Sequence, residues 1–306
     1  MNDPVQIIKT LEAAGFRAAF LPYGAIERIT TVYEGMAETA PSYAQNAAKH
    51  FQKFQPPDIS FTPLSFLVVA CPSPPARLTV RVEGKDISIP IPAIYIDKPY
   101  IDSHMEESVV SATQGYQTAH TKGISQKLLT VMSGLGTYGR NNLCYIKGIG
   151  SHCRLATFYT DVPFDGVVHE PLTFMASCST CTVCRKRCPT RAITDAPVID
   201  AELCINQYTY RLDPLPAHIP KTAFNALIGC CLCQDKCPAN PRPKEDEWQT
   251  LPLDEAETRA FLAYEDPMPP ELEAKLRDFF KNDHFLSVAG RNAAWVLEAQ
   301  QIQFIK

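Results

Sequence analysis

The chain has 306 residues, 45% of them hydrophobic and 20% charged, which is enough apolar material for a substantial core. Its net charge is −4, and residues 244–306 alone carry −6, so it lacks the clearly basic character of a strong nucleic-acid binder. The most apolar run, Ser65 to Cys71, is too short to cross a membrane, and the N-terminus lacks the basic and apolar regions of a signal peptide. We therefore expect a cytoplasmic protein that does not act at a membrane.

Hydrophobic spacing over the first 170 residues predicts a mixture of helices and strands. Apolar residues at helical intervals predict helices over 4–15, 42–53, 103–118 and 124–133. Apolar, β-rich runs predict strands over 16–23, 65–71 and 153–159. Alternation over 78–96 predicts a hairpin that turns at Gly84-Lys85, and Pro90 and Pro92 favour a sheet edge for its second strand. This mixture is typical of an α/β or α+β domain.

The C-terminal part is acidic and its spacing predicts helices over 254–264, 270–281 and 284–300. Together with the cysteine-rich stretch between them, these patterns divide the chain into three. We expect an α/β domain over 1–171, a ferredoxin-like cluster domain over 172–242, and a helical tail over 243–306 that packs on the core.

Twelve cysteines, mostly in C-x2-C runs, indicate metal ligation in a reducing compartment rather than a disulfide framework. The first run, Cys178 to Pro189, has the spacing C-x2-C-x2-C-x3-C-P of bacterial ferredoxins. The second run, Cys230 to Pro238, keeps a C-x2-C-x3-C-P core, and Cys204 stands alone between the two.

This spacing predicts two [4Fe–4S] clusters, because the fourth cysteine of each run ligates the other cluster in two-cluster ferredoxins. The first cluster would take Cys178, Cys181, Cys184 and Cys237. The second would take Cys188, Cys204, Cys230 and Cys233. Zinc also binds C-x2-C pairs, but it needs four ligands and does not require so long a run. The remaining cysteines are expected to be small buried hydrophobic residues: Cys71, Cys144, Cys153 and Cys231.

Three further motifs precede the cysteines. They are the turn Ser133-Gly-Leu-Gly136-Thr-Tyr-Gly139-Arg, the loop Gly148-Ile-Gly150-Ser151 and the tetrad Thr160-Asp161-Val-Pro163. In this order, and with the eight cysteines, they resemble epoxyqueuosine reductase, the cobalamin-dependent enzyme of queuosine-tRNA synthesis, which is related to the corrinoid reductive dehalogenases. The resemblance covers roughly residues 120–300.

The resemblance implies that the N-terminal domain holds a cobalamin, and that the clusters pass it electrons from a reduced ferredoxin or flavodoxin. The implied cofactor-binding residues are Gly134, Gly136, Gly139, Gly148, Gly150 and Ser151. Glycine lets the backbone approach a flat macrocycle closely. The same glycines also suit a helix C-cap and tight turns that need no ligand.

The sequence departs from the family at the catalytic acid. The family carries an Asp shortly before the glycine turn, whereas no Asp or Glu lies between Glu107 and Asp161 here. An ungapped count places His120 there, and a short gap would shift the match to Thr121 or Lys122. Histidine is a competent general acid near neutral pH, although an ordinary surface histidine is the plainer interpretation.

Two other residues are weighed as functional candidates. Tyr138, inside the glycine turn, could donate a proton as dehalogenase tyrosines do, although such a tyrosine more often packs. Asp102-Ser-His104 begins an incomplete D-x-H-x-x-G cobalamin motif whose last position is Glu107, and we interpret it as chance.

Two functions remain at this stage. The first is an iron–sulfur oxidoreductase that reduces an unidentified substrate through a corrinoid, with tRNA disfavoured by the acidic tail. The second is an electron-transfer protein that serves a partner's cofactor and has no substrate of its own.

Overall fold

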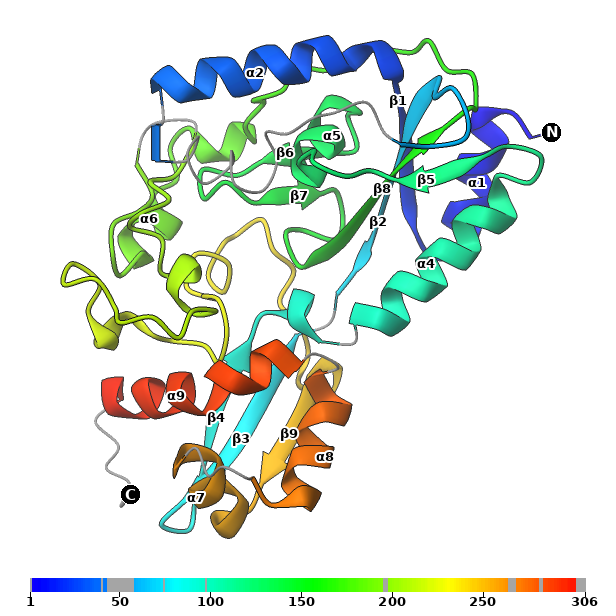
Figure 1. Ribbon diagram of the computed structural model, residues 1–306. Helices are drawn as coiled ribbons and strands as arrows, with labels where there is room; N and C mark the ends of the chain where they lie inside the picture. Colours follow the sequence, from blue (N-terminus) through cyan, green and yellow to red (C-terminus); the bar gives the residue numbers. More distant parts are fainter. Residues whose placement is uncertain are drawn as a thin grey trace. The chain divides into compact units, whose positions relative to one another are not determined.

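The computed structural model describes residues 2–39, 41–42, 58–73, 75–96, 98–194, 198–263, 268–280 and 283–300. The chain forms two compact units (Figure 1). Unit 1 contains residues 1–72, 100–182 and 193–201, and unit 2 contains residues 73–99, 183–192 and 202–306. The helix predicted over 42–53 lies almost entirely outside the described residues. No helix within the described ranges is long and apolar enough to cross a bilayer.

Unit 1 is built on an antiparallel four-stranded sheet in the order β1-β2-β8-β5. Its strands are β1 (Arg17–Pro22), β2 (Ser65–Pro72), β8 (Cys153–Thr160) and β5 (Thr118–His120). The predicted strands over 16–23, 65–71 and 153–159 are confirmed. Strand β2 is central and buried along almost its whole length, which explains why its sequence is continuously apolar rather than alternating.

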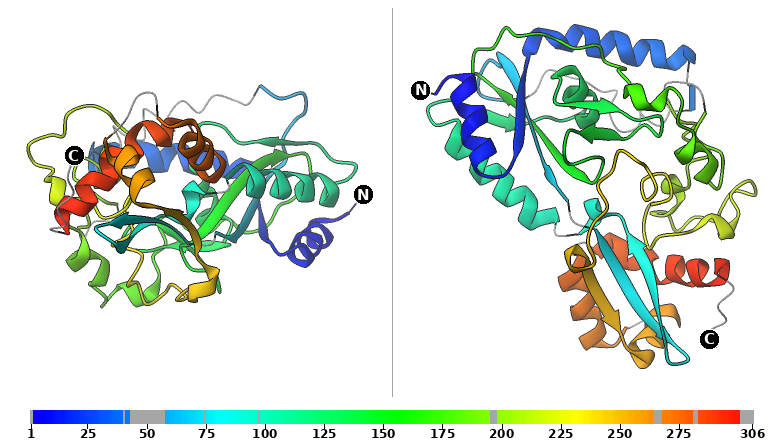
Figure 2. Two further views of the ribbon diagram at one scale, coloured as in Figure 1. Left: turned by 90° about the horizontal axis from the view of Figure 1, so that it is seen from below. Right: turned by 180° about the vertical axis from the view of Figure 1, so that it is seen from behind.

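Helices cover both faces of this sheet (Figures 1 and 2). Successive strand residues point to opposite faces, so Phe66 and Leu67 of β2 enter different apolar clusters. The Phe66 face packs against helices α2 (Ile26–Thr39) and α5 (Gln126–Met132). The Leu67 face packs against helices α1 (Pro4–Ala13) and α4 (Lys98–Ala112). The α/β layering expected for the N-terminal domain is confirmed.

A small hairpin follows α5 in unit 1. Strands β6 (Gly136–Tyr138) and β7 (Cys144–Ile146) pair antiparallel, and both are buried. The hairpin contains the predicted glycine turn, which therefore forms a strand pair with its own core cluster rather than an open loop.

Unit 2 contains a three-stranded sheet in the order β4-β3-β9. Strands β3 (Ala76–Val82) and β4 (Lys85–Ile91) form the predicted hairpin, with β4 at the edge. The turn is Glu83-Gly84, one residue before the predicted position, and both residues have positive φ, as a type I′ turn requires. Strand β9 (Gln249–Leu253) lies parallel to β3.

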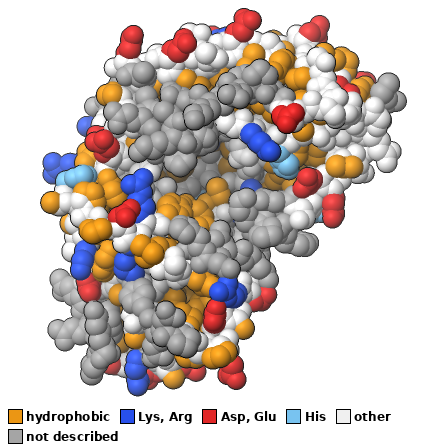
Figure 3. Space-filling view, in the orientation of Figure 1, with side chains coloured by type: hydrophobic (Ala, Val, Ile, Leu, Met, Phe, Trp, Pro, Cys, Tyr) orange, Lys and Arg blue, Asp and Glu red, His pale blue; other side chains and the backbone are white. Residues whose placement is uncertain are grey.

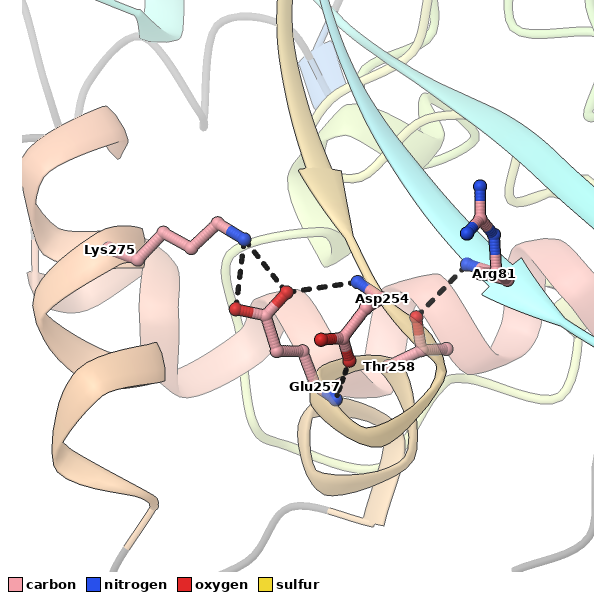
Figure 4. Close-up of polar contacts among 5 residues, drawn as sticks. All are labelled: Arg81, Asp254, Glu257, Thr258 and Lys275. Carbon is pink, nitrogen blue, oxygen red and sulfur yellow. Dashed lines mark hydrogen bonds and ion pairs between the residues drawn. The ribbon is translucent and has the colours of Figure 1, made fainter.

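The tail helices of unit 2 are α7 (Glu255–Ala263), α8 (Pro270–Phe280) and α9 (Asp283–Ala299), close to their predicted bounds. Figure 4 shows how α7 is fixed. Asp254 and Glu257 form a reciprocal cap at its N-terminus, and Glu257 also accepts hydrogen bonds from Lys275 of α8 at 2.7 and 2.9 Å. Thr258 Oγ1 accepts from the backbone N–H of Arg81 on β3.

The two units do not follow the boundaries expected at residues 171 and 242. The β3–β4 hairpin, which the sequence places in the first domain, shares a core with the C-terminal helices. The reason is the parallel pairing of β3 with β9, which joins residues far apart in the chain. The cysteine-rich stretch likewise divides, because residues 172–182 group with unit 1 and residues 183–192 with unit 2.

Candidate functional site

The second cysteine set lies entirely within unit 2. A negative charge on Cys188 would add to the rise that burial causes in the pKa of the Cys230 thiol. Cys204 immediately precedes the short 3-10 helix Ile205–Tyr208. The assignment of these four cysteines to one cluster stays a prediction.

The two cysteine runs are also joined directly in unit 2. Helix α6 (Val183–Arg187) leads from Cys184 to Cys188, whose N–H donates to the Cys184 carbonyl at 3.0 Å. At the end of α6, the Nε of Arg187 donates to the carbonyl of Leu232 in the second run at 3.2 Å. This bond fixes Leu232, the residue before Cys233, next to the end of α6, which Cys188 directly follows.

Two sulfurs of this set already accept hydrogen bonds from nitrogen. The N–H of Ala192 donates to Cys188 Sγ at 3.2 Å, and Asn225 Nδ2 donates to Cys230 Sγ at 3.1 Å. Burial raises the pKa of Cys230, while Asn225 and the N–H of Leu232 act in the opposite direction. Such donors are typical around thiolates that ligate iron.

The cysteines of the first set belong to both units. Cys178 and Cys181 group with unit 1, and Cys184 and Cys237 with unit 2. Local turns hold two of them: the N–H of Cys178 donates to the carbonyl of Met175, and the N–H of Cys237 donates to the carbonyl of Gln234. In the described part of the chain, no three His, Cys, Asp or Glu side chains gather as ligands of one metal ion. A cubane cluster places one thiolate on each of its irons, so its ligands stand apart from one another.

The β6–β7 hairpin is bonded to the segment that leads into Cys178. The N–H of Tyr138 donates to the Thr173 carbonyl, and the N–H of Met175 donates to the Tyr138 carbonyl, both at 2.9 Å. Arg140, at the end of β6, donates to the carbonyl of Cys178 itself. Within unit 1, the glycine turn and the first ligand of the first run therefore form one hydrogen-bonded structure.

The first three predicted cofactor glycines face their own chain. A Cβ added at Gly134 would lie 2.5 Å from His169, and one at Gly136 would lie 2.7 Å from Cys144 Sγ. At Gly139 it would lie 2.5 Å from the Tyr145 ring. Packing within unit 1 accounts for the lack of a side chain at all three positions, and their role in binding a cofactor stays a prediction.

The second glycine loop is a tight turn. Gly148 and Gly150 have φ of +81° and +77°, which glycine adopts without steric cost. Gly150 also exchanges backbone hydrogen bonds with Ile146 of β7, at 2.8 and 3.0 Å. A Cβ at Gly148 would meet nothing within 4 Å, and Ser151 is buried. The turn geometry accounts for these glycines without a ligand.

His120 lies on the edge strand β5 with its side chain 47% exposed. Its Nε2 is 3.5 Å from Glu106 Oε1 on α4, and its ring lies 4.4 Å from that of Phe158. Glu106 cannot be recognised as a partner of His120 from the sequence, because the contact depends on how α4 packs beside β5. Thr121, the alternative position, points its hydroxyl at Thr157 of β8.

Tyr138 is only 5% exposed and belongs to the core cluster of the hairpin. Lys127 of α5 stands 6.0 Å from its ring and donates to the carbonyl and Oδ1 of Asn142. Asn142 has φ of +59°, and its buried Nδ2 has no hydrogen-bond partner among the described residues. Neither Lys127 nor Asn142 was identified from the sequence, although an asparagine beside a glycine turn is a usual sign of left-handed backbone.

Three of the four cysteines outside the two sets are buried as predicted, whereas Cys153 is only partly buried. Cys71, Cys144 and Cys231 are buried, and none of the twelve cysteines, all within described ranges, is in a disulfide. Burial raises the pKa of Cys144 and Cys153 to about 12 and that of Cys231 well above its ordinary value. They therefore remain neutral thiols. His104, from the incomplete cobalamin motif, stacks on Phe16 at 5.5 Å.

Comparison with known proteins identifies the class. Residues 177–240 match the family described as the 4Fe-4S double cluster binding domain. This match covers both cysteine runs and Cys204, and the prediction of two [4Fe–4S] clusters is thereby confirmed.

The wider chain is similar to epoxyqueuosine reductases. It is 30% identical to that of Cyclobacterium marinum over 186 residues, which are 60% of this chain and 55% of the relative. It is 32% identical to that of Synechocystis sp. over 169 residues, which are 55% of this chain and 54% of the relative. The chain thus spans about half the length of the curated relatives it matches.

A solved epoxyqueuosine reductase from Bacillus subtilis, with its catalytic loop swung out of the active site, shares the fold. The similarity has a TM-score of 0.64 at 19% identity and covers 96% of this chain and 81% of that one. A second solved structure is an epoxyqueuosine reductase with an epoxyqueuosine-modified tRNA stem loop. Its similarity to this chain has a TM-score of 0.64 at 19% identity and covers 96% of this chain and 80% of that one. The chain is therefore epoxyqueuosine reductase-like in sequence and fold and carries a double [4Fe–4S] cluster domain.

The contacts of Gly136 predict a test of its role. Gly136→Ala should lower the thermal unfolding temperature of cofactor-free protein by several degrees, because the new methyl group overlaps Cys144 and Ile146. Gly24→Ala is the matched control, since a Cβ there meets nothing within 4 Å. An unchanged unfolding temperature for Gly136→Ala would contradict the packing role of this glycine and leave ligand binding as the explanation for it.

The ligand assignment predicts different outcomes for adjacent cysteines. Cys233→Ser should remove about half of the iron bound after anaerobic reconstitution, because one of two clusters loses a ligand. Cys231→Ser should retain full iron, because that thiol is buried and protonated. Iron and sulfide analysis of both variants is the measurement, and equal losses would mean that the second run is assigned wrongly.

Proposed function

We propose that the protein is an iron–sulfur oxidoreductase of the epoxyqueuosine reductase type. Single electrons from a reduced ferredoxin or flavodoxin would pass through the two clusters to an acceptor held by unit 1. The observation that carries this proposal is the bonding of the β6–β7 hairpin to the segment that leads into Cys178. Arg140 donates to the Cys178 carbonyl, and the backbone of Tyr138 bonds to Thr173 and Met175. Electrons that reach the first run would thus arrive beside the motifs that the chain shares with these reductases.

The chemistry suits such a relay. Reduction of an epoxide takes up two electrons, whereas [4Fe–4S] clusters transfer electrons one at a time. The proposed ligands of the second cluster all belong to unit 2. Cluster potentials range from roughly −700 to +450 mV according to the surroundings of the thiolates, so the protein can order the two steps through hydrogen bonding and burial.

A corrinoid is the acceptor that the family resemblance implies, and we include it in the proposal on that ground alone. When bound, a corrinoid would supply a strongly reducing metal centre. The turn glycines Gly134, Gly136 and Gly139 give it no support, because their own chain fills the space beside them. We therefore assign no residue contact and no reaction step to it.

The second part of the proposal is a tRNA substrate, although the negative charge of the C-terminal tail argues against one. Its support is the solved relative that holds a modified tRNA stem loop. In unit 2, a hollow of about 470 Å³ has a mostly apolar lining, to which Asp213, Lys221, Arg291 and Trp295 also contribute. Both cations lie over the indole, at 5.5 and 4.7 Å from its centre. An aromatic ring among cations is a common device for binding single-stranded RNA, which an overall charge does not reveal.

The surface is otherwise mixed in charge. On the face shown in Figure 3, the described Lys and Arg side chains lie in several separate places with Asp and Glu between them. A contact with RNA would thus be local, and the Lys221 hollow is the place we propose for it.

For the proton that reduction requires, His120 remains the proposed donor. Its Nε2 faces Glu106, and nearly half of its side chain is open to solvent, so it can be reprotonated after each turnover. Tyr138 is the weaker candidate, because its ring is buried among Phe174 and its neighbours in the hairpin.

One experiment distinguishes the proposed reductase from the alternative function, which is electron delivery to a partner's cofactor. Protein with reconstituted clusters is mixed anaerobically with cobalamin, gel-filtered, and examined by absorption spectroscopy. The proposed reductase should co-elute with corrinoid in about equimolar amount, whereas bovine serum albumin carried through the same procedure should not. Elution with full iron content but without corrinoid would favour the alternative.

The tRNA proposal predicts salt-sensitive binding. Lys221→Glu should weaken tRNA binding in a gel-shift titration and reduce the slope of log affinity against log salt by about one, because one phosphate contact is lost. Lys85→Glu makes the same charge change on the exposed β3–β4 turn of the same unit and should leave the slope unchanged. Lack of any shift by the unmodified chain at low salt would exclude a tRNA substrate.

A further inference from the structure

Asn225 occupies a fixed place beside the second cysteine run. It lies between the short 3-10 helix Lys221–Ala223 and Cys230, and its side chain is partly buried. Its Nδ2 donates to Cys230 Sγ at 3.1 Å and to the carbonyl of Ala223 at 2.9 Å. Its Oδ1 accepts from the backbone N–H of Cys231 at 3.1 Å.

The chemistry of these partners fixes the orientation of the amide. The N–H of Cys231 can only donate and the carbonyl of Ala223 can only accept, so Oδ1 must face the first and Nδ2 the second. Reversing the amide would lose both bonds. The hydrogen that remains on Nδ2 is therefore directed at the sulfur of Cys230.

We propose that Asn225 is a positioning residue that sets the reduction potential of the second [4Fe–4S] cluster through its hydrogen bond to Cys230. The inference rests on the proposed ligation of that cluster by Cys230. A donor to a ligating sulfur stabilises negative charge on the cluster. The reduced cluster carries one more negative charge than the oxidised one, so the bond favours reduction and raises the potential.

The surroundings strengthen this effect. Cys230 is partly buried and packs against the apolar core of unit 2. In such surroundings a hydrogen bond to a charged acceptor is worth more than at an exposed site. Cys188, of the same set, receives its bond from the backbone of Ala192, whereas Cys230 depends on a side chain that substitution can change.

The test is an anaerobic redox titration followed by electron paramagnetic resonance. Asn225→Asp keeps an oxygen for the N–H of Cys231 but removes the donor to sulfur. The second cluster should then become harder to reduce by at least tenfold in its one-electron equilibrium, about 59 mV, while the first cluster keeps its potential. Asn206→Asp is the matched control, because it makes the same charge change within unit 2 at a side chain whose oxygen accepts a hydrogen bond from Tyr95 Oη.

Each outcome decides the proposal. An unchanged potential with full iron content, or an equal shift in Asn206→Asp, would contradict it. If Asn225→Asp binds less iron, unaltered protein labelled with 15N-asparagine provides the second readout. Its reduced second cluster should show hyperfine coupling to an asparagine nitrogen, and absence of that coupling would also contradict the proposal. Absence of a second cluster from the unaltered protein would instead overturn the ligation by Cys230, and is distinguished by iron content.

Discussion

Thiolate ligation is the constraint on which the structure of the cysteine-rich stretch depends. Between residues 161 and 248 the longest regular element among the described residues is α6, with five residues. The cysteine loops are otherwise held by single backbone turns and by contacts such as that of Arg187 with Leu232. Burial opposes ionisation of Cys230, whereas iron binds the thiolate. Cluster assembly and the final order of these loops are therefore coupled.

The C-terminal helices stabilise this stretch from outside it. Asn292 of α9 is fully buried, and its Nδ2 donates to the carbonyls of Thr209 and Leu227 at 2.9 and 2.8 Å. Thr209 in turn accepts at its hydroxyl from the N–H of Gly229, next to Cys230. The acidic tail thus fixes the approach to the second cysteine run, and the pairing of β9 with β3 fixes the tail. Its role is structural support for the cluster loops.

Much of the fold could be predicted because its signals are local. The apolar run of β2, the alternation of the β3–β4 hairpin and the spacing of the tail helices each identified an element. Helix α2 was not predicted, since Thr30, Thr31 and Val32 favour a strand and Gly35 interrupts the helical pattern. Strands β5 and β9 are short and exist through pairing with distant strands, which a local pattern cannot indicate.

The candidate site divides in the same way. The cysteine spacing alone predicted the clusters, because ligation of a cubane requires those intervals. The glycine motifs alone could not predict a cofactor site, since a glycine that makes room for a cofactor and a glycine that makes room for a neighbouring side chain are identical in the sequence. Only the contacts of Gly134 with His169 and of Gly139 with Tyr145 separate the two. The partners Glu106 and Asn225 were hidden for a similar reason, because each acts across space on a residue that its own motif does not include.

The most direct test of the central claim is the iron and acid-labile sulfide content of the anaerobically reconstituted full chain, read with its electron paramagnetic resonance spectrum after reduction. Two [4Fe–4S] clusters predict about eight iron and eight sulfide per chain and the signals of two interacting reduced clusters. About four of each with a single signal, or zinc without sulfide, would contradict it.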